Sequence, residues 1–385
     1  MQRLTCPARP DWRGRLSSMG MTWFDATPEH PVPYWTETAA YAFTSAQIRT
    51  LQAASQELTD LVLAATGHAI EHRRLTELGI PVWLHDAVQA SWERDDPSVY
   101  LRLDLAYSGE GQPKLLEVNG QTPTSLIEAA ICQWHWLEDQ QACGALAPDL
   151  SQWNTIHEGL GEQWQHLVGA HGLQHVTFSS ARNDEDYATV TYLRDLAQAA
   201  GAATSQLFAE DLGTSPDHAH LLDGWSLPIR NLMWLWPLEF AWESRDAPVL
   251  ATTQTRFIEP LWKAVSSSKG LLALLHELSP GHELLLPATL NPGTLEIPGV
   301  LKPLFSREGQ NVTLPGQPST PGEYGDLSCV EQAYTALPEF MAEDGTARYP
   351  VLGVWVAGSE VCGLGIREGR GRVTDNRASF IPHFT

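Results

Sequence analysis

Residues 100–119 read YLRLDLAYSGEGQPKLLEVN, and this stretch decides both the fold and the candidate site. Alternating leucines at its start predict a strand whose opposite face carries Arg102 and Asp104. The glycine-containing residues 109–112 then predict a turn, and a second apolar run follows directly. The stretch therefore predicts a β-hairpin with one polar and one apolar face.

Antiparallel pairing through that turn would place Asp104 opposite Glu117, and Arg102 opposite Asn119, on the polar face. Two carboxylates directly opposite each other repel, so the arrangement is unfavourable unless a cation lies between them. Aspartate, glutamate and asparagine oxygens suit Mg²⁺, which keeps some waters and binds substrate phosphates. The neighbouring arginine fits the charge of a phosphoryl group in transfer. An ordinary solvated hairpin face with an arginine–glutamate pair is the alternative.

The composition is that of a folded globular chain, and it limits the partners. The 385 residues are 43% hydrophobic and 18% charged, enough for a sizeable core in two or three packed units. The net charge of −22 argues against nonspecific binding to nucleic acid or anionic membranes, which requires basic patches. It is compatible with a cationic substrate such as a polyamine.

The five cysteines indicate neither a disulfide framework nor a zinc site, because they are scattered and form no CxxC pair. The first residues contain no apolar segment of the signal-peptide type, and no run reaches transmembrane length. We therefore expect a cytoplasmic protein without nucleic-acid or membrane partners, present as a monomer or a homodimer.

Helical periodicity marks residues 44–78, where Thr44 begins a capping box, and a shorter helix is expected over 80–92. After the hairpin, Thr122 as N-cap and Pro123 at the first helical position predict the start of another helix. Its unpaired amides would face the polar side of the hairpin, a position favourable to anions. An ordinary capped helix without a ligand is the alternative.

Residues 151–250 alternate between predicted helices and strands, as in an open α/β sheet. Glu185 and Asp186 belong to an acidic cluster at the start of one of these helices, where acidic residues usually serve as caps. An aromatic segment over residues 230–239 ends in Glu239. This segment either belongs to the core or forms one wall of a pocket that uses the glutamate.

Two lysines stand out because the chain has only 24 basic residues. Lys269 follows a run of serines, and Lys302 lies in a predicted apolar strand over 299–304. Such point charges hold nucleotide phosphates, and a loop containing Gly309 could cover them. A lone lysine on a strand is more often a surface group that extends to water. There is no Walker A motif and no GxGxxG after a strand, so neither a P-loop nor a Rossmann site is supported.

Four segments, taken together, resemble glutathionylspermidine synthase, and more closely the stand-alone bacterial proteins similar to its synthetase domain. They cover residues 101–130, 257–288, 301–312 and 349–384, and they occur in the order of that family. We expect no counterpart of the family's amidase domain in this chain.

The resemblance implies an α+β fold of the ATP-grasp type, like glutathione synthetase, with a pre-ATP-grasp α/β region and a helical N-terminal part. We expect residues 1–95 to form an arm and helices that pack on the core. Residues 96–250 would supply the metal-site hairpin and the substrate region. Residues 251–385 would bind nucleotide and carry the loop that covers the phosphates.

The resemblance also implies roles for single residues. Arg102 would stabilise the transferring phosphoryl group, Arg367 would lie near the reacting phosphate, and Mg²⁺ would be bound by Asp104, Glu117 and Asn119. The ATP-binding residues would be Lys269 and Lys302 at the phosphates, Ser306, Arg307 and Gly309 in the covering loop, and Glu331 and Gln332 at the adenine hinge. Thr122, Glu185 and Asp186 fall where the family holds its peptide substrate, and Glu239 would also bind substrate.

We therefore expect an ADP-forming carboxylate–amine ligase that uses ATP and Mg²⁺ and makes an amide through an acyl phosphate. Its substrates would be a peptide or amino-acid carboxylate and an amine or polyamine. One alternative is a catalytically silent ATP-grasp protein that binds nucleotide or polyamine, although the retained acidic and basic set argues against it. Another is a phosphotransferase that stops at a phosphorylated carboxylate.

Overall fold

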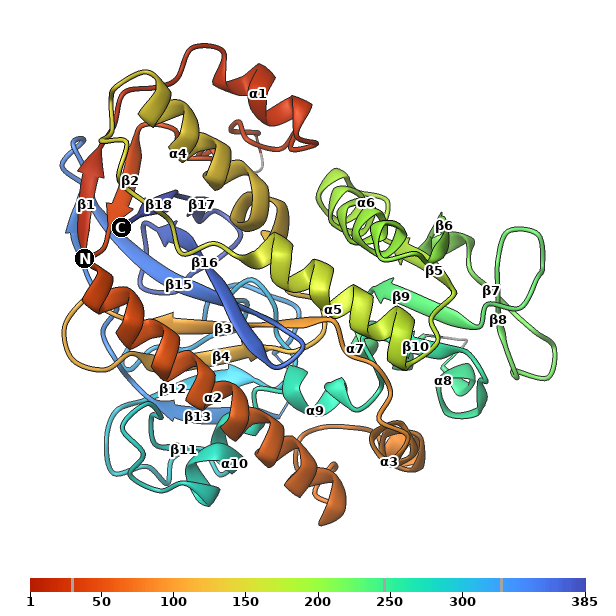
Figure 1. Ribbon diagram of the computed structural model, residues 1–385. Helices are drawn as coiled ribbons and strands as arrows, with labels where there is room; N and C mark the ends of the chain where they lie inside the picture. Colours follow the sequence, from red (N-terminus) through yellow and green to blue (C-terminus); the bar gives the residue numbers. More distant parts are fainter. Residues whose placement is uncertain (29–30, 245–246, 326–327) are drawn as a thin grey trace.

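A central six-stranded sheet carries the predicted hairpin (Figure 1). The structure is a computed structural model, and it describes residues 1–28, 31–244, 247–325 and 328–385. Five strands follow one another in the order β17-β16-β15-β3-β4, and β14 pairs with β15 beside them. Their bounds are Tyr100–Ala106 (β3), Lys114–Asn119 (β4), Phe340–Met341 (β14), Ala347–Ala357 (β15), Glu360–Gly369 (β16) and Ser379–Phe380 (β17).

The register of the hairpin confirms the prediction from the sequence. Asp104 on β3 pairs with Glu117 on β4, and Arg102 pairs with Asn119. The register shifts between Asp104 and Leu105, because Leu115 pairs with Leu105 and Leu116 of β4 is left without a partner in the pairing. On its other edge β3 is antiparallel to β15, so it lies inside the sheet and its side chains are buried on both faces.

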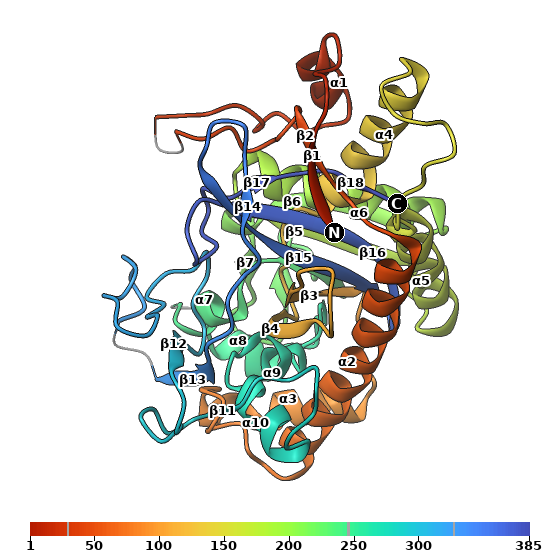
Figure 2. The ribbon, with the colours of Figure 1, turned by 90° about the vertical axis from the view of Figure 1, so that its left-hand side faces the viewer.

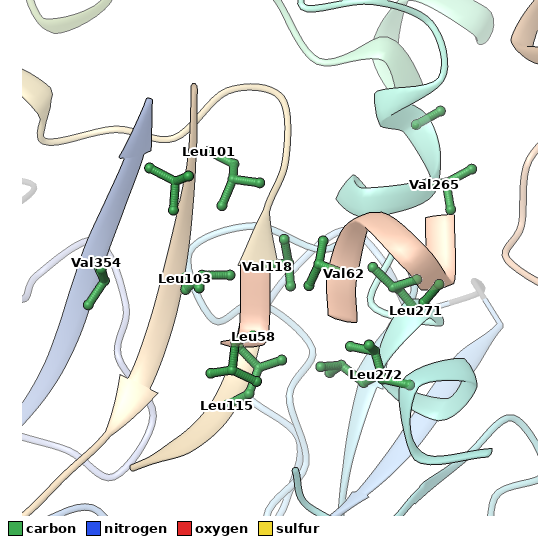
Figure 3. Packing of buried hydrophobic residues seen from close by; sticks show 14 of the residues in the cluster. Leu58, Val62, Leu101, Leu103, Leu115, Val118, Val265, Leu271, Leu272 and Val354 are labelled. Atoms are coloured by element: carbon green, nitrogen blue, oxygen red, sulfur yellow. The ribbon is translucent and has the colours of Figure 1, made fainter. Parts of the chain in front are cut away.

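A long helix covers the apolar face of the hairpin. Thr44 is the N-cap of this helix, α2 (Ser45–Glu71). The side chains of Thr44 and Gln47 form the predicted capping box. The helix ends at Glu71, earlier than the sequence periodicity indicated. Leu58 and Val62 of α2 pack among the leucines and valines of β3, β4 and the segment after residue 262 (Figure 3). Burial of this apolar stripe fixes the helix against the sheet.

A second, smaller sheet confirms the predicted α/β alternation. Its order is β10-β9-β5-β6, and all neighbouring strands are parallel. Helices α5 and α6 pack on each other, and this lobe lies to the right of the central sheet in Figure 1. The bounds are Ile156–Ala170 (α5), His175–Ser180 (β5), Asp184–Ala199 (α6), Ala203–Phe208 (β6), Asn231–Leu235 (β9) and Arg256–Ile258 (β10).

A third sheet carries Lys302 and faces β4. Its order is β11-β13-β12, and helix α10 packs against β11 and β13. The elements are α9 (Lys263–Ser267), α10 (Leu271–Leu278), β11 (Ala288–Thr289), β12 (Gly299–Pro303) and β13 (Cys329–Ala333). The strand predicted for residues 299–304 is thus β12, and the lysine lies within it.

The two ends of the chain share one small sheet. Strand β2 (Ala39–Ala42) pairs with β1 (Gln2–Thr5) on one side and with β18 (His383–Phe384) on the other (Figure 2). Arg3 on β1 forms two hydrogen bonds with the buried carboxylate of Glu368, at 2.8 and 3.0 Å, and Tyr41 donates a third at 2.7 Å. The N-terminal arm is therefore fixed to β16 by a buried charge pair.

The remaining elements are short. They are α1 (Trp12–Ser18), η1 (Val82–Leu84), α3 (His85–Glu93), η2 (Glu128–Cys132), α4 (Gln133–Ala142), η3 (Ala209–Asp211), β7 (Gly213–Thr214), β8 (Leu221–Leu222), α7 (Leu238–Trp242) and α8 (Pro248–Thr252). No helix among the described residues combines the length and apolarity needed to cross a bilayer.

The helix predicted to start at Thr122 and Pro123 starts later. Helical backbone begins at residue 126, passes through the π-helical turn η2 and continues as α4. Ser125 has a φ of 69°, in the left-handed region, and this conformation separates the helix from the preceding residues. Arg102 Nη1 donates a 2.6 Å hydrogen bond to the Thr124 carbonyl. The segment before the helix thus serves the side chains of the hairpin rather than a helical cap, and the predicted start is wrong.

Candidate active site

A cleft of about 280 Å³ lies between the polar face of the hairpin, the lysine-bearing strand β12 and the loop after it. Most residues singled out from the sequence line it, although they come from all parts of the chain. These residues are Arg102, Asp104, Glu117, Asn119, Thr122, Glu185, Glu239, Lys269, Lys302, Ser306, Arg307, Gly309, Gln332 and Arg367. The two lysines therefore face the same space as the three expected metal ligands, Asp104, Glu117 and Asn119.

Arg102 and Asp104 form a buried pair in the wall of the cleft. Arg102 Nε and Nη2 donate to the two carboxylate oxygens of Asp104 at 2.6 and 3.0 Å. Their exposures are 4% and 2%, which excludes the alternative of a solvated hairpin face. Arg367 on β16 approaches the same carboxylate, with Nη2 3.5 Å from Oδ2. Two arginines from different strands thus converge on one aspartate.

Glu117 lies among the positive charges of the cleft. Lys269 Nζ is 3.4 Å from its Oε2. Burial alone would raise the pKa of this carboxyl, but Lys269 and Lys302, together with Arg102 and Arg367, lower the pKa to about 2. The carboxylate therefore stays ionised at every pH at which the protein would work.

Lys302 is held by uncharged oxygens, and it joins two sheets. Its ammonium donates to the Leu116 carbonyl of β4 at 2.8 Å and to Gln332 Oε1 of β13 at 2.7 Å. Gln332 in turn donates to the Leu115 carbonyl at 3.0 Å. Burial lowers the pKa of Lys302 to about 8, and Glu117 acts in the opposite direction. An anion entering the cleft would therefore meet an ammonium that has few charged partners.

The loop after β12 closes over the other lysine. Lys269 Nζ donates to the Ser306 carbonyl at 2.6 Å. Gly309 has a φ of 68°, and a Cβ added there would lie 2.6 Å from the Thr374 carbonyl oxygen, so this position requires glycine. The segment expected to cover phosphates thus touches both the lysine and the opposite wall of the cleft.

Arg307 of the same loop contacts two of the residues that were expected to bind substrate. Its Nε and Nη2 lie 2.9 and 2.8 Å from Glu239 Oε1, and Nη1 donates to Thr122 Oγ1 at 2.8 Å. The sequence assigned Arg307 to the covering loop and the other two residues to substrate binding, and gave no sign that they touch. The contact joins the covering loop to α7 and to the segment that follows β4.

Three carboxyl groups, those of Glu185, Asp186 and Glu128, lie near one another, and among them Glu185 lines the cleft. Burial, with Glu128 and Asp186 nearby, raises the pKa of Glu185 to about 8. Burial also raises the pKa of Asp186. Glu128 in η2 is fully buried, and Trp23 Nε1 donates to its Oε1 at 2.9 Å. Burial raises the pKa of this carboxyl too. Both Glu185 and Glu128 thus favour the neutral form more than exposed glutamates do.

Two of the expected residues do not line the cleft, and some lining residues were missed. Asp186 lies in the first turn of α6, where its backbone amide is capped by Asn183, and Glu331 accepts from the Gly293 amide at 2.6 Å. Tyr34 lines the cleft and hydrogen-bonds Ser125 at 2.8 Å. It lies in the N-terminal arm, where no local sequence pattern could have indicated a site residue.

The donor set of the hairpin fits a cation that is only partly held by protein. Among the described residues, no group of three or more His, Cys, Asp or Glu side chains is placed to hold a metal ion. Glu117 offers a carboxylate, Asn119 offers its amide oxygen, and the Asp104 carboxylate is shared with Arg102. The buried amide nitrogen of Asn119 has no hydrogen-bond partner, and as a donor it would suit a phosphate oxygen rather than the cation. An amide and two carboxylates suit Mg²⁺ when water and phosphate complete its shell. The fit is therefore to a metal–nucleotide complex rather than to a bare ion.

Comparisons with known proteins decide the family. The family described as "Glutathionylspermidine synthase preATP-grasp" matches residues 3–385. The chain belongs to this family. A Haemophilus influenzae protein named "Putative acid--amine ligase" is 36% identical, and the match covers 100% of this chain and 99% of that protein.

Other members of the glutathionylspermidine synthase family are more distant. Trypanothione synthetase of Crithidia fasciculata is 25% identical over 83% of this chain and 52% of its own length. The bifunctional glutathionylspermidine synthetase/amidase of Escherichia coli is 23% identical over 78% of this chain and 52% of its own length. The chain thus spans about half the length of these two relatives.

A solved structure confirms the predicted fold. The apo form of a glutathione synthetase-like effector from Globodera pallida covers 98% of this chain with a TM-score of 0.56 at 11% identity, and 99% of that chain is matched. At this identity the likeness concerns the fold alone. The α+β architecture of the glutathione synthetase type, expected from the sequence, is thereby confirmed.

Proposed function

We propose that this chain is an ATP-dependent ligase that joins a carboxylic acid to an amine and forms ADP. That it is an enzyme of the ligase class follows from its family, whose members named above are ligases or synthetases. One observation supports the finer proposal most strongly. Glu117 of the hairpin lies 3.4 Å from Lys269, and Lys302 lines the same cleft. A carboxylate that could bind a metal ion and two lysines that could bind phosphate therefore surround one space.

In the first step, a carboxylate oxygen of the acid attacks the γ-phosphorus of ATP. The bond to the bridging oxygen breaks, ADP leaves, and an acyl phosphate forms. Lys302 and Lys269 would bind the phosphates, and Arg102 and Arg367 would offset charge on the transferring group. Asp104, Glu117 and Asn119 would hold Mg²⁺, which neutralises phosphate charge when bound.

In the second step, the amine nitrogen attacks the acyl carbon. The carbon–oxygen bond to phosphate breaks, and the nitrogen gives up one proton, which leaves with the inorganic phosphate. Catalysis would depend on positioning and charge, so no nucleophilic side chain of the protein is needed. Ser306, Arg307 and Gly309 would cover the phosphates, and the segment of β13 around Glu331 and Gln332 would bind the adenine.

The substrate side of the cleft is assigned to Thr122, Glu185, Asp186 and Glu239. The Glu239 carboxylate suits an amine that carries positive charge, and the peptide or amino-acid carboxylate would point toward Arg102. Glutathione and spermidine are the substrates to test first, because the family is named for their product.

A screen of acid–amine pairs for amine-dependent ADP formation tests the proposal. Mass spectrometry of the product should show an amide with the mass of the acid plus the amine minus water. ADP release without an amide would instead indicate a phosphotransferase. Nucleotide binding without ADP release under any pair would indicate a protein that only binds ligands.

A further inference from the structure

The guanidinium of Arg307 already occupies a cationic position inside the cleft. It lies between the carboxylate of Glu239 at the start of α7 and the hydroxyl of Thr122 beyond β4, with hydrogen bonds of 2.8 to 2.9 Å. The guanidinium carbon lies 5.8 Å from the centre of the Phe240 ring. A cation at this point is therefore stabilised by a carboxylate, a hydroxyl and an aromatic ring.

This contact is weaker than the other arginine pair of the cleft. Arg102 donates to both oxygens of Asp104, and the two side chains are 5% and 3% exposed. Arg307 directs its two contacts with Glu239 to a single carboxylate oxygen, and its side chain is 30% exposed. A fork that engages two oxygens is the stronger geometry, and exposure to water weakens an ion pair further.

Glu239 depends on its partner more than Arg307 does. The side chain of Glu239 is only 8% exposed, so its carboxylate has lost most of its water and requires a compensating cation. Arg307 can return to water when its loop moves, because it belongs to the segment after β12. The buried carboxylate thus depends on a cation at this point, whereas the more exposed guanidinium does not depend on this one carboxylate.

We propose that Glu239 and Thr122, with the Phe240 ring beside them, form the subsite for an ammonium group of the amine substrate other than the nitrogen that reacts, and that Arg307 occupies this subsite until the amine displaces it. The inference rests on the proposed function, since it assigns one substrate group within that cleft. A primary ammonium has three N–H donors, enough to replace the contacts to Glu239 and Thr122. An ammonium group is smaller than the guanidinium group of Arg307, so it would fit in the space that this group now fills.

Displacement would couple amine binding to the covering loop. Arg307 follows Ser306, whose carbonyl accepts the hydrogen bond from Lys269. An amine that releases Arg307 therefore changes the position of the loop at the lysine expected to bind phosphate. An amine would have to compete with an internal cation. Its apparent affinity would equal the affinity for the open subsite multiplied by the fraction of molecules in which the subsite is open.

Two substitutions test this competition because they act in opposite directions. Binding of spermidine and 1,4-diaminobutane to the full chain would be measured by calorimetry with Mg²⁺ and a non-hydrolysable ATP analogue. Glu239→Gln removes the charge of the subsite and should weaken binding by roughly tenfold or more. Arg307→Gln removes the competitor and should strengthen binding several-fold. The neutral analogue 1,4-butanediol should respond to neither change.

Matched controls come from a similar pair outside the cleft. Arg13 contacts Asp25 at 2.7 Å, lies over the Trp12 ring and is exposed. Arg13→Gln and Asp25→Asn should leave diamine binding unchanged. Thermal unfolding of each variant shows whether it is folded, and Glu239→Asp, which keeps the charge, should retain part of the affinity.

The outcomes separate the subsite from the reaction. Unchanged binding in Glu239→Gln, weaker binding in Arg307→Gln, or no diamine binding by any variant would overturn the subsite. Diamine binding with the expected opposite responses, but without ADP formation for any acid, would keep the subsite and refute the ligase proposal. Amine-dependent ADP formation with a KM for the amine insensitive to Glu239→Gln would do the reverse.

Discussion

Lys269 Nζ lies 3.4 Å from Glu117 Oε2, so a lysine from the segment between α9 and α10 neutralises one of the two carboxylates that the hairpin sets opposite each other. The repulsion that the pairing of Asp104 with Glu117 would create is thus already offset in part by protein cations. Arg102 and Arg367 likewise offset the negative charge of Asp104.

Glu117→Gln should lower the rate of ADP formation by roughly tenfold or more and raise the Mg²⁺ concentration required, because it removes one expected ligand. Titration of activity with MgCl₂ at saturating ATP measures this change. Glu110→Gln is the matched control, since Glu110 is exposed at the opposite end of the same hairpin. An unaltered Mg²⁺ requirement would argue against Glu117 as a ligand.

Arg102→Ala should lower turnover by roughly 10²-fold or more, with a smaller change in the KM for ATP, as expected for a group that acts in the transition state. The substitution also leaves Asp104 buried without its main partner, so thermal unfolding must be measured in parallel. Arg102→Lys keeps the charge but loses the fork. We expect it to recover the unfolding temperature more than the turnover. Wild-type turnover in Arg102→Ala would refute the role.

Affinity for ATP should fall as pH rises through about 8, because burial gives Lys302 a pKa near that value and the neutral amine no longer attracts phosphate. Below this pH the ammonium is charged and the affinity should be constant. Equilibrium binding of ATP between pH 6.5 and 9.5 measures the profile. Lys302→Arg should remove the fall, since arginine stays charged throughout this range. A fall of equal size in that variant would assign the titration to another group.

The contribution of Glu185 to the free energy of unfolding should fall as pH rises, whereas that of a carboxylate with a lowered pKa falls as pH decreases. Its pKa is raised from 4.5 to about 8, so folding favours the protonated form. The stabilising contribution is complete below about 4.5 and is lost progressively as pH rises to about 8. Glu185→Gln, which mimics the protonated carboxyl, should therefore unfold at a higher temperature than the wild type at pH 8.5, and the difference should vanish near pH 4.5. Asp195→Asn, an exposed position on the same helix, is the control.

The hairpin could be predicted because its register follows from local rules. Alternation fixes the face of Arg102 and Asp104, and a turn between two apolar runs fixes the pairing partner. The capping box at Thr44 is local in the same sense. Residues linked by such rules lie within a few positions of each other or across one turn.

What the sequence could not provide depends on contacts between distant segments. The start of the helix after the hairpin is set by Ser125 in a left-handed conformation, beside the carbonyl that Arg102 holds. The Arg307–Glu239 contact and the place of Tyr34 in the cleft likewise join segments far apart in the chain. No periodicity or spacing encodes such pairs, because tertiary packing decides them.

The position of β3 inside the central sheet limits how this protein can be divided. Its partner β15 comes from the last part of the chain, so a fragment that stops before residue 347 would leave the leucine-rich β3 as an open edge. Unprotected edges recruit strands from other molecules. Fragments that separate β3 from β15 should consequently aggregate, and dissecting the enzyme by truncation would remove the strand that pairs with β3 along Arg102 and Asp104.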